Sequence, residues 1–307
     1  MAKTKVAVTA WMFGTGGVTA EQAEIAEKIG FDSFWLPESH FGGDTSIPSP
    51  LMLLAAVSAR TSKIRLGSTS YLLPIRHPIQ AAEEVAVLDR LSNGRVILGV
   101  GRGFQDTMYS AFDVPIKDKR KLFKANLEIM IAAWQGKPVA EDGDGMPAYL
   151  APLPVQKPHP PIWVAAFGPL AIKQAGTLGL PYIASPVETM ASLLENYSLH
   201  KDHAERAGHV VPDTTPVMRT LFVSEHKQLV SAVRENLTKE AAHRMRKQAA
   251  SVDDWAIIGD SAYVSNKISE YEETLGLNYL IARGRIPGVS NDSQIASLEQ
   301  LAKITGL

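Results

Sequence analysis

The sequence predicts an α/β protein of the (β/α)8 TIM-barrel class with insertions, the largest of them after the seventh strand. Eight apolar segments of strand length recur along the chain, and most are followed by a segment with the period of an amphipathic helix. The length of 307 residues suits one such barrel, which needs about 250 residues before insertions. No linker divides the chain, so residues 1–307 are expected to form a single domain.

The first four strand–helix units are the most regular part of the sequence. We expect strands at 6–11, 33–36, 64–72 and 95–100, and helices at 19–29, 50–60 and 78–93. Thr19 is the expected N-cap of the first helix, because Gln22 stands three residues later in the capping-box position. Pro50 and Pro78 fit the first turns of the next two helices.

The second half repeats the pattern with interruptions. A long helix is expected at 117–135, followed by an irregular Gly- and Pro-containing segment at 136–160 with a small hairpin. Strands are then expected at 162–166, 182–185, 217–223 and 279–282, and helices at 169–178, 188–207 and 292–304. Residues 225–275 are interpreted as a mostly helical insertion, since they are too long for one crossover.

Composition excludes several classes of function. A net charge of -1 gives no reason to expect nucleic acid or an anionic membrane as a partner. The absence of cysteine excludes disulfides, thiol nucleophiles and thiolate metal sites. No run approaches the roughly 18 apolar residues of a membrane span, and the N-terminal apolar run is too short for a secretory signal. We therefore expect a cytoplasmic protein.

The carboxyl ends of the predicted strands carry aromatic side chains and arginines, with one histidine and few carboxylates. Chemistry in such barrels takes place at these ends. In chain order they are Trp11 and Phe13; Glu38, Ser39 and His40; Thr69, Ser70 and Tyr71; Gly101 and Arg102; Phe167 and Gly168; Pro186; Arg283 and Arg285. This set fits a large, flat, anionic cofactor better than metal-assisted hydrolysis, so no metal site is predicted.

The segment at 95–120 indicates an anion site. A buried strand runs into closely spaced glycines around Arg102, and a second basic cluster follows at 117–121. A tight turn with a surface arginine is the alternative interpretation. The dinucleotide fingerprint is not present, because Phe104 stands where its last glycine belongs.

The runs at 67–78, 83–94 and 99–103, together with Arg120, resemble the luciferase-like flavin monooxygenases, a family that includes enzymes using the deazaflavin F420. The resemblance covers nearly the whole chain. It implies that Arg102 and Arg120 lie near the flavin phosphate, and that the backbone N–H groups at Phe167 and Gly168 bind the same phosphate. It also implies a cis peptide at Thr69-Ser70 under the isoalloxazine ring.

The resemblance gives His40 a place near the chemistry. His40 stands one position after the catalytic histidine of bacterial luciferase, and that catalytic position is Ser39 here. The departure puts the aldehyde oxidation of light emission in doubt. Glu38 is expected to orient His40 or to contact substrate; the alternative is a loop histidine bonded to nearby backbone. His200 and His203 are interpreted as part of a solvated helix face.

Three functions remain open on the sequence. The first is a two-component monooxygenase that receives reduced FMN from a separate flavin reductase and uses O₂ to oxygenate a small organic substrate. Trp11, Phe13, Phe41 and Tyr71 would supply its dry walls. The second is an F420-dependent oxidoreductase that transfers hydride without oxygen, and the third is a non-catalytic flavin-binding subunit. The family resemblance and the apolar residues in the helices expected at 50–60 and 78–93 predict a homodimer.

Overall fold

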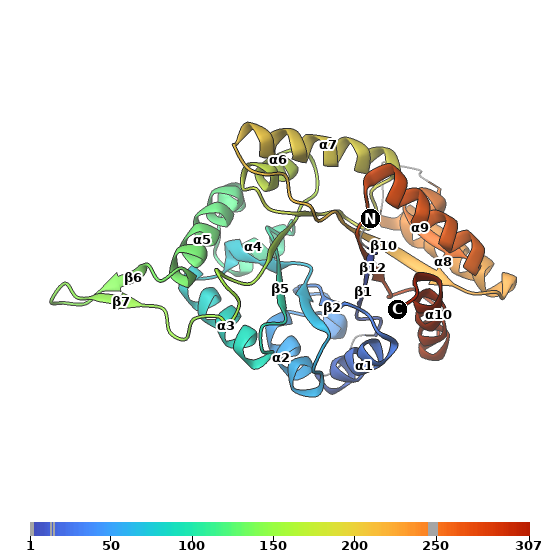
Figure 1. The fold of residues 1–307 in the computed structure, drawn as a ribbon, viewed down its shortest axis with the longest axis horizontal. Coiled ribbons are helices and arrows are strands. Elements are labelled where there is room, and N and C mark those ends of the chain that lie inside the picture. The colour runs from blue at the N-terminus through green and yellow to red at the C-terminus, as the bar shows by residue number, and fades with distance from the viewer. Residues whose placement is uncertain (1–2, 13, 15, 245–250) are drawn as a thin grey trace. The chain divides into compact units, whose positions relative to one another are not determined.

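A computed structural model describes residues 3–12, 14, 16–244 and 251–307 (Figure 1). Contacts between Cα atoms divide the chain into two compact units, and each is described by itself. The first unit comprises residues 1–12, 22–34 and 164–307, and the second comprises residues 13–21 and 35–163. Helix α1 (Gly16–Ile29) and strands β2 (Ser33–Leu36) and β8 (Ile162–Ala165) cross the division in sequence.

Parallel strands and the helices that follow them make up the second unit. The elements are α2 (Pro50–Arg60), β3 (Arg65–Ser68), β4 (Tyr71–Leu72), α3 (Pro78–Leu91), β5 (Val96–Gly101), α4 (Asp106–Ala111), α5 (Lys119–Trp134), β6 (Pro138–Glu141) and β7 (Pro147–Tyr149), with 3-10 turns η1 (Gly43–Thr45), η2 (Leu73–Ile75) and η3 (Ile116–Asp118). Strand β5 is buried along its whole length and pairs in parallel with β3 and β4. The strand expected at 64–72 is therefore two short strands, separated at Thr69 and Ser70.

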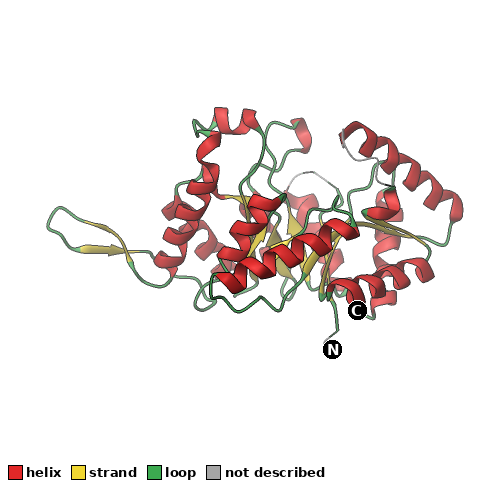
Figure 2. Cartoon of the chain, turned by 90° about the horizontal axis from the view of Figure 1, so that it is seen from above, coloured by secondary structure: helices red, strands yellow, loops and turns green. Residues whose placement is uncertain are grey.

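The hairpin expected between residues 136 and 160 is present. Strands β6 and β7 pair antiparallel, and their residues are almost all exposed. The hairpin extends away from the helices of its own unit in both views (Figures 1 and 2). It buries little apolar surface, so the core of the second unit does not depend on it.

The first unit contains a second parallel set of strands. Strand β10 (Pro216–Val223) lies between β11 (Ala256–Gly259) and β12 (Tyr279–Arg283), and β12 also pairs with β1 (Lys5–Thr9). Strand β9 (Tyr182–Ile183) pairs with β8, and the residue after it, Ala184, bridges to Val217. The helices are α6 (Pro169–Thr177), α7 (Met190–Arg206), α8 (Lys227–Arg244), α9 (Ser261–Leu275) and α10 (Asn291–Thr305), with the 3-10 turn η4 (Val252–Asp254).

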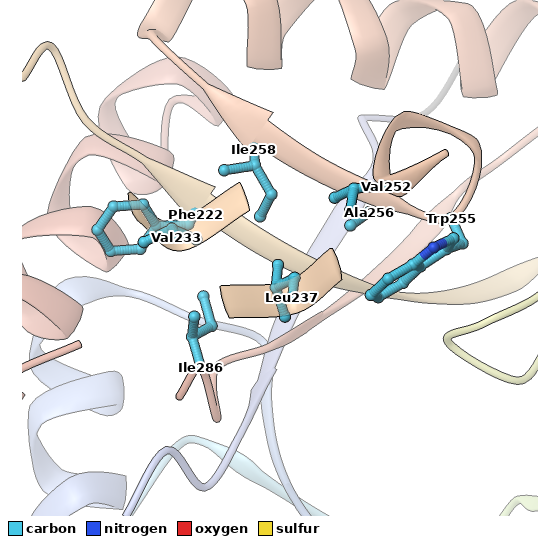
Figure 3. Packing of buried hydrophobic residues seen from close by; sticks show 8 residues of the cluster. All are labelled: Phe222, Val233, Leu237, Val252, Trp255, Ala256, Ile258 and Ile286. Carbon is cyan, nitrogen blue, oxygen red and sulfur yellow. The ribbon is translucent and has the colours of Figure 1, made fainter. Parts of the chain in front are cut away.

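The segment at 225–275 contains a strand that the sequence analysis missed. Residues of β11, α8 and η4 form a buried cluster with Phe222 of β10 (Figure 3). The cluster comprises Phe222, Val233, Leu237, Val252, Trp255, Ala256, Ile258 and Ile286. The prediction of a mostly helical insertion was wrong at β11, because a four-residue apolar run has no period that separates strand from helix.

Two local predictions were wrong. Helix α1 begins at Gly16, so Thr19 lies inside the helix, where it is buried, and does not cap it. The Gln22 side chain instead closes the turn after β1: its oxygen accepts hydrogen bonds from the N–H groups of Trp11 and Met12, both at 2.8 Å. The solvated-face interpretation fails for His200, which is buried with Nε2 2.8 Å from the carbonyl of Leu180.

No cluster of His, Cys, Asp or Glu among the described residues has an arrangement that could hold a metal ion. None of the helices with described placement is long and apolar enough to cross a membrane.

Arg95 joins the helix ends at the amino-terminal side of β5. Its guanidinium donates to the carbonyls of Ser92, Ile64, Ser58 and Thr61 and to the Thr61 hydroxyl, at 2.7–3.1 Å. These groups belong to the ends of α2 and α3 or to the turns that follow them. We assign these hydrogen bonds to stability and not to catalysis, because the chemistry of a barrel takes place at the carboxyl ends of its strands.

We predict that Arg95→Met lowers the free energy of unfolding by about 3 kcal/mol or more, because it leaves several carbonyls without a donor. Arg90→Met is the matched control, since Arg90 is exposed and makes a single 3.3 Å contact with the carbonyl of Leu153. Thermal and urea unfolding of both variants measure the difference. Equal losses in the two variants would contradict the assignment.

Candidate active site

A buried carboxylate organises the loop that follows β2. The Glu38 side chain is fully buried, and its Oε1 accepts from His40 Nε2 and from Arg76 Nη1, each at 2.8 Å. Its Oε2 accepts from the N–H of Leu72 at 3.0 Å. A buried charge is tolerated when it is paired and its remaining lone pairs accept hydrogen bonds, and Glu38 meets both conditions. The expectation that Glu38 orients His40 fits this geometry.

His40 lies at the wall of a cavity within the second unit. The side chain is only 6% exposed, and its ring packs against Phe112 at 5.1 Å and Phe41 at 5.8 Å between centroids. Tyr71, Arg76, His77 and Phe112 line the same cavity, whose volume is about 220 Å³. His40 therefore bonds a carboxylate and not a backbone group, contrary to the loop-histidine alternative.

Ser39, which occupies the position of luciferase's catalytic histidine in the resemblance, has a structural contact. Its hydroxyl accepts a 3.0 Å hydrogen bond from the N–H of Ile47. Its own N–H donates to the Ile47 carbonyl at 2.9 Å. The two bonds close the loop between β2 and α2 beside His40.

Ser70 and Gly101 are packed directly against each other. The Thr69-Ser70 peptide bond is cis, as predicted. Strand β4 begins after it and pairs with β5, with Leu72 opposite Gly101. A Cβ placed on Gly101 would lie 2.0 Å from the Oγ of Ser70 and 2.7 Å from its Cβ, so only glycine fits this position without a shift. The predicted cofactor residues of these two strands thus share one edge.

Arg102 and Arg120 lie near enough for their charges to interact. Arg102 follows β5 directly, and Arg120 lies in the first turn of α5. Burial lowers the pKa of Arg102, and the neighbouring positive charge of Arg120 lowers it further. Two like charges held this close repel each other, so an anion placed at them gains from both.

Tyr109 holds the loop that carries Arg102. Its hydroxyl donates to the carbonyl of Arg102. Burial raises the pKa of Tyr109 to about 12, so the hydroxyl keeps its proton at neutral pH. Tyr109 comes from α4, a helix of six residues that the sequence analysis did not predict. No periodic signal identifies so short a helix.

Other predicted residues belong to the first unit. Gly168, with φ of +82°, precedes α6, and Phe167 before it is 71% exposed. Trp11 is buried, and its indole N–H donates to Asn291 at 2.9 Å. Phe13 lies outside the described residues. The roles of Phe167 and Gly168 at a phosphate, and of Trp11 at a dry wall, stay predictions.

Arg76 is the participant that the sequence analysis missed. It was read there only as part of the 67–78 run that carries the family resemblance. The signal that could have found it is a pair of complementary charges at successive strand ends: Glu38 follows β2, and Arg76 follows β3 and β4, of which β3 neighbours β2 in the sheet. Carboxyl ends of parallel strands meet at the same edge, which brings such charges together.

Comparison with known proteins identifies the family. The profile of the luciferase-like monooxygenases matches residues 14–278. The chain belongs to this family. It is 32% identical over 199 residues to limonene 1,2-monooxygenase of Rhodococcus erythropolis, covering 62% of this chain and 51% of that protein. It is 34% identical over 163 residues to the oxygenase component of the flavin-dependent trigonelline monooxygenase of Acinetobacter baylyi, covering 48% and 42%.

The luciferase-like fold is confirmed by solved structures. A monooxygenase from Streptomyces bottropensis superimposes with a TM-score of 0.83 at 22% identity, covering 97% of this chain and 98% of that one. The oxygenating constituent of 3,6-diketocamphane monooxygenase from Pseudomonas putida, in complex with FMN, gives 0.82 at 21% identity, with coverages of 98% and 97%. The predicted TIM-barrel class is thereby confirmed. Among the curated relatives that it matches, the chain spans about half of the length, 42–62%.

We predict that Gly101→Ala disturbs the contact with Ser70 and lowers the free energy of unfolding by about 1–3 kcal/mol, the usual cost of overpacking. Ser70→Gly in the same chain should recover part of the loss, because it removes the atoms that clash. Gly143→Ala is the control, since a Cβ there meets nothing within 4 Å. If Gly101→Ala unfolds at the same temperature as Gly143→Ala, the contact does not constrain this edge.

Proposed function

We propose that this luciferase-like protein is the oxygenase component of a two-component flavin monooxygenase, which uses reduced FMN and O₂ to oxygenate a small organic substrate. The observation that carries the proposal is Arg102, which directly follows Gly101 of the Ser70–Gly101 contact and lies near enough to Arg120 for that positive charge to lower its pKa. The pair suits a phosphate, and the absence of a side chain at Gly101 suits the close approach of a flat ring system.

The residues that would hold FMN follow from this arrangement. Arg102 and Arg120 would bind its phosphate, and Thr69, Ser70 and Gly101 would lie against the isoalloxazine ring. The backbone N–H groups at Phe167 and Gly168, at the start of α6, are also proposed phosphate ligands, since helix N-termini favour anions. Reduced FMN, when bound, supplies the two electrons with which one oxygen atom of O₂ enters the substrate and the other leaves as water.

The chain's own contribution is proton transfer and exclusion of water. His40 is proposed as the catalytic proton donor or acceptor, since it is held by Glu38 and faces a cavity. Phe41 and Phe112 pack on its ring and limit the access of water. A separate flavin reductase is proposed as a partner, because the similar trigonelline and diketocamphane proteins are named as oxygenase components or constituents.

An F420-dependent oxidoreductase is the second candidate. A structure of an F420-dependent secondary alcohol dehydrogenase, in complex with an F420-acetone adduct, superimposes on this chain with a TM-score of 0.79 at 19% identity, covering 99% of each chain. In that case the arginine pair would bind the F420 phosphate, and O₂ would not be consumed. A non-catalytic flavin-binding subunit ranks third, because His40, Arg102 and Arg120 are all present.

We predict that purified protein binds reduced FMN more tightly than F420, and that it consumes O₂ when a flavin reductase supplies reduced FMN in the presence of substrate. Titration by fluorescence or absorbance ranks the cofactors, and an oxygen electrode follows the reaction. Tight F420 binding with hydride transfer and no O₂ uptake would replace the first proposal by the second.

We predict that Arg102→Ala weakens FMN binding about 10- to 150-fold, because charge-assisted hydrogen bonds to a phosphate contribute about 1.5–3 kcal/mol. Riboflavin lacks the phosphate, so it should bind the wild type and the variant almost equally. Arg102→Lys should recover only part of the loss, since an ammonium lacks the planar fork. Calorimetry with both ligands separates the accounts, and equal losses for FMN and riboflavin would make Arg102 structural.

We also propose a homodimer through α2 and α3. These helices expose Met52 by 73%, Leu91 by 60% and Val87 by 43%. Sedimentation at micromolar concentration should give twice the chain mass, and Met52→Glu should shift the equilibrium toward monomer. A monomeric wild type would refute the proposal. Leu194→Glu on α7, where Leu194 is 43% exposed, serves as the control.

A further inference from the structure

We infer that Arg76 is a positioning residue that keeps Glu38 as an acceptor-only carboxylate, so that His40 carries its proton on Nε2 and presents Nδ1 for reaction. The inference rests on the proposed function in one respect, the catalytic role of His40. The assignment of the proton to one ring nitrogen stands on the hydrogen bonds alone.

Hydrogen-bond donors surround the carboxylate of Glu38. Both oxygens of this carboxylate face donors: the Arg76 guanidinium and the His40 ring at Oε1, and the N–H of Leu72 at Oε2. The Arg76 N–H and the Leu72 N–H cannot accept a proton from Glu38. Both contacts therefore use Glu38 as the acceptor, and a carboxylate is the form that makes an ion pair with the Arg76 guanidinium.

The contact with Glu38 determines which ring nitrogen of His40 carries the proton. A carboxylate has no proton to donate, so the ring nitrogen 2.8 Å from Glu38 Oε1 must carry one. That nitrogen is Nε2. In the neutral imidazole the other nitrogen, Nδ1, is then the acceptor, and it is the atom left to exchange a proton with substrate or cofactor.

The guanidinium of Arg76 is held on several sides. Its Nη1 also donates to the carbonyl of Leu72 at 2.8 Å, and its carbon centre lies 3.9 Å above the ring of Tyr71. Tyr71 is in turn fixed by a 2.7 Å hydrogen bond from its hydroxyl to Glu84. Asn126 Nδ2 donates to the carbonyl of Arg76 at 3.0 Å, which anchors the backbone.

The consequence is a link between two loops of the predicted site. Arg76 and Glu38 both bond to Leu72, the second residue of β4, and β4 begins directly after Ser70. Arg76 therefore holds the His40 loop to β4, the strand that follows Ser70. If the charge of Arg76 is removed, the buried carboxylate of Glu38 loses its ion-pair partner, which favours the protonated acid. A protonated Glu38 can donate to Nε2 of His40. The ring proton would then move to Nδ1.

Nitrogen-15 NMR of histidine-labelled protein tests the inference without any assay of activity. The His40 signals are assigned by their loss in His40→Gln. In the neutral form of the wild type we expect Nε2 to carry the proton. In Arg76→Gln and Arg76→Met, which remove the charge, we expect the Nδ1-protonated form to appear. Arg76→Lys keeps a charge and should keep more of the wild-type tautomer.

Turnover gives the second readout. With saturating reduced FMN, Arg76→Gln should lower kcat about 10²-fold, the range for a lost general acid or base, and change the Kd for FMN less than about threefold. Arg76→Lys should recover part of kcat. Arg95→Gln is the matched control: it removes a guanidinium from the same unit and should lower stability while leaving the His40 tautomer as in the wild type.

A proton on Nδ1 in the wild type would overturn the inference by itself, whether or not the Arg76 variants fold. An unchanged tautomer in a folded Arg76→Gln or Arg76→Met would also overturn it. If the wild type consumes no O₂ with reduced FMN, the proposed function fails, and the tautomer measurement still decides the assignment of the proton.

Discussion

The ion pair between the buried carboxylate of Glu38 and the partly exposed guanidinium of Arg76 is the interaction on which the candidate site depends. Glu38 follows one parallel strand and Arg76 follows another, and their 2.8 Å contact joins the loops that carry His40 and Ser70. Such an ion pair adds little net stability compared with apolar residues, but loss of Arg76 leaves the buried charge of Glu38 uncompensated. Its value here lies in geometry, because it fixes both the ring of His40 and the start of β4.

Strand β5 has an arginine at each end, and the two arginines have different roles. Arg95, before β5, donates to backbone carbonyls that terminate helices, so its contribution is stability. Arg102, after β5, lies near enough to Arg120 for that positive charge to lower its pKa. Six residues of buried strand separate the two. An arginine thus stabilises the fold before β5, and another arginine, after β5, is proposed to bind the cofactor.

The sequence predicted those features that depend on local chemistry and strand order. The strand–helix period predicted the fold class, and the glycines at 99, 101 and 103 indicated an anion site at Arg102. The cis peptide at Thr69-Ser70 was predicted from family resemblance alone. Arg76 was missed because its partner is distant in sequence, and no local pattern reports a side-chain contact of that range. The capping box at Thr19 failed because α1 begins three residues earlier, at Gly16, and the Gln22 side chain accepts from the turn after β1.

The central claim is that the guanidiniums of Arg102 and Arg120 bind the phosphate of a flavin whose ring lies against Ser70 and Gly101. A crystal structure of the protein soaked with FMN tests it most directly. The account predicts phosphate oxygens within hydrogen-bond distance of both arginines, and the isoalloxazine ring against the Ser70–Gly101 edge. A phosphate bound instead at Arg76 and His77, in the cavity beside His40, would contradict it.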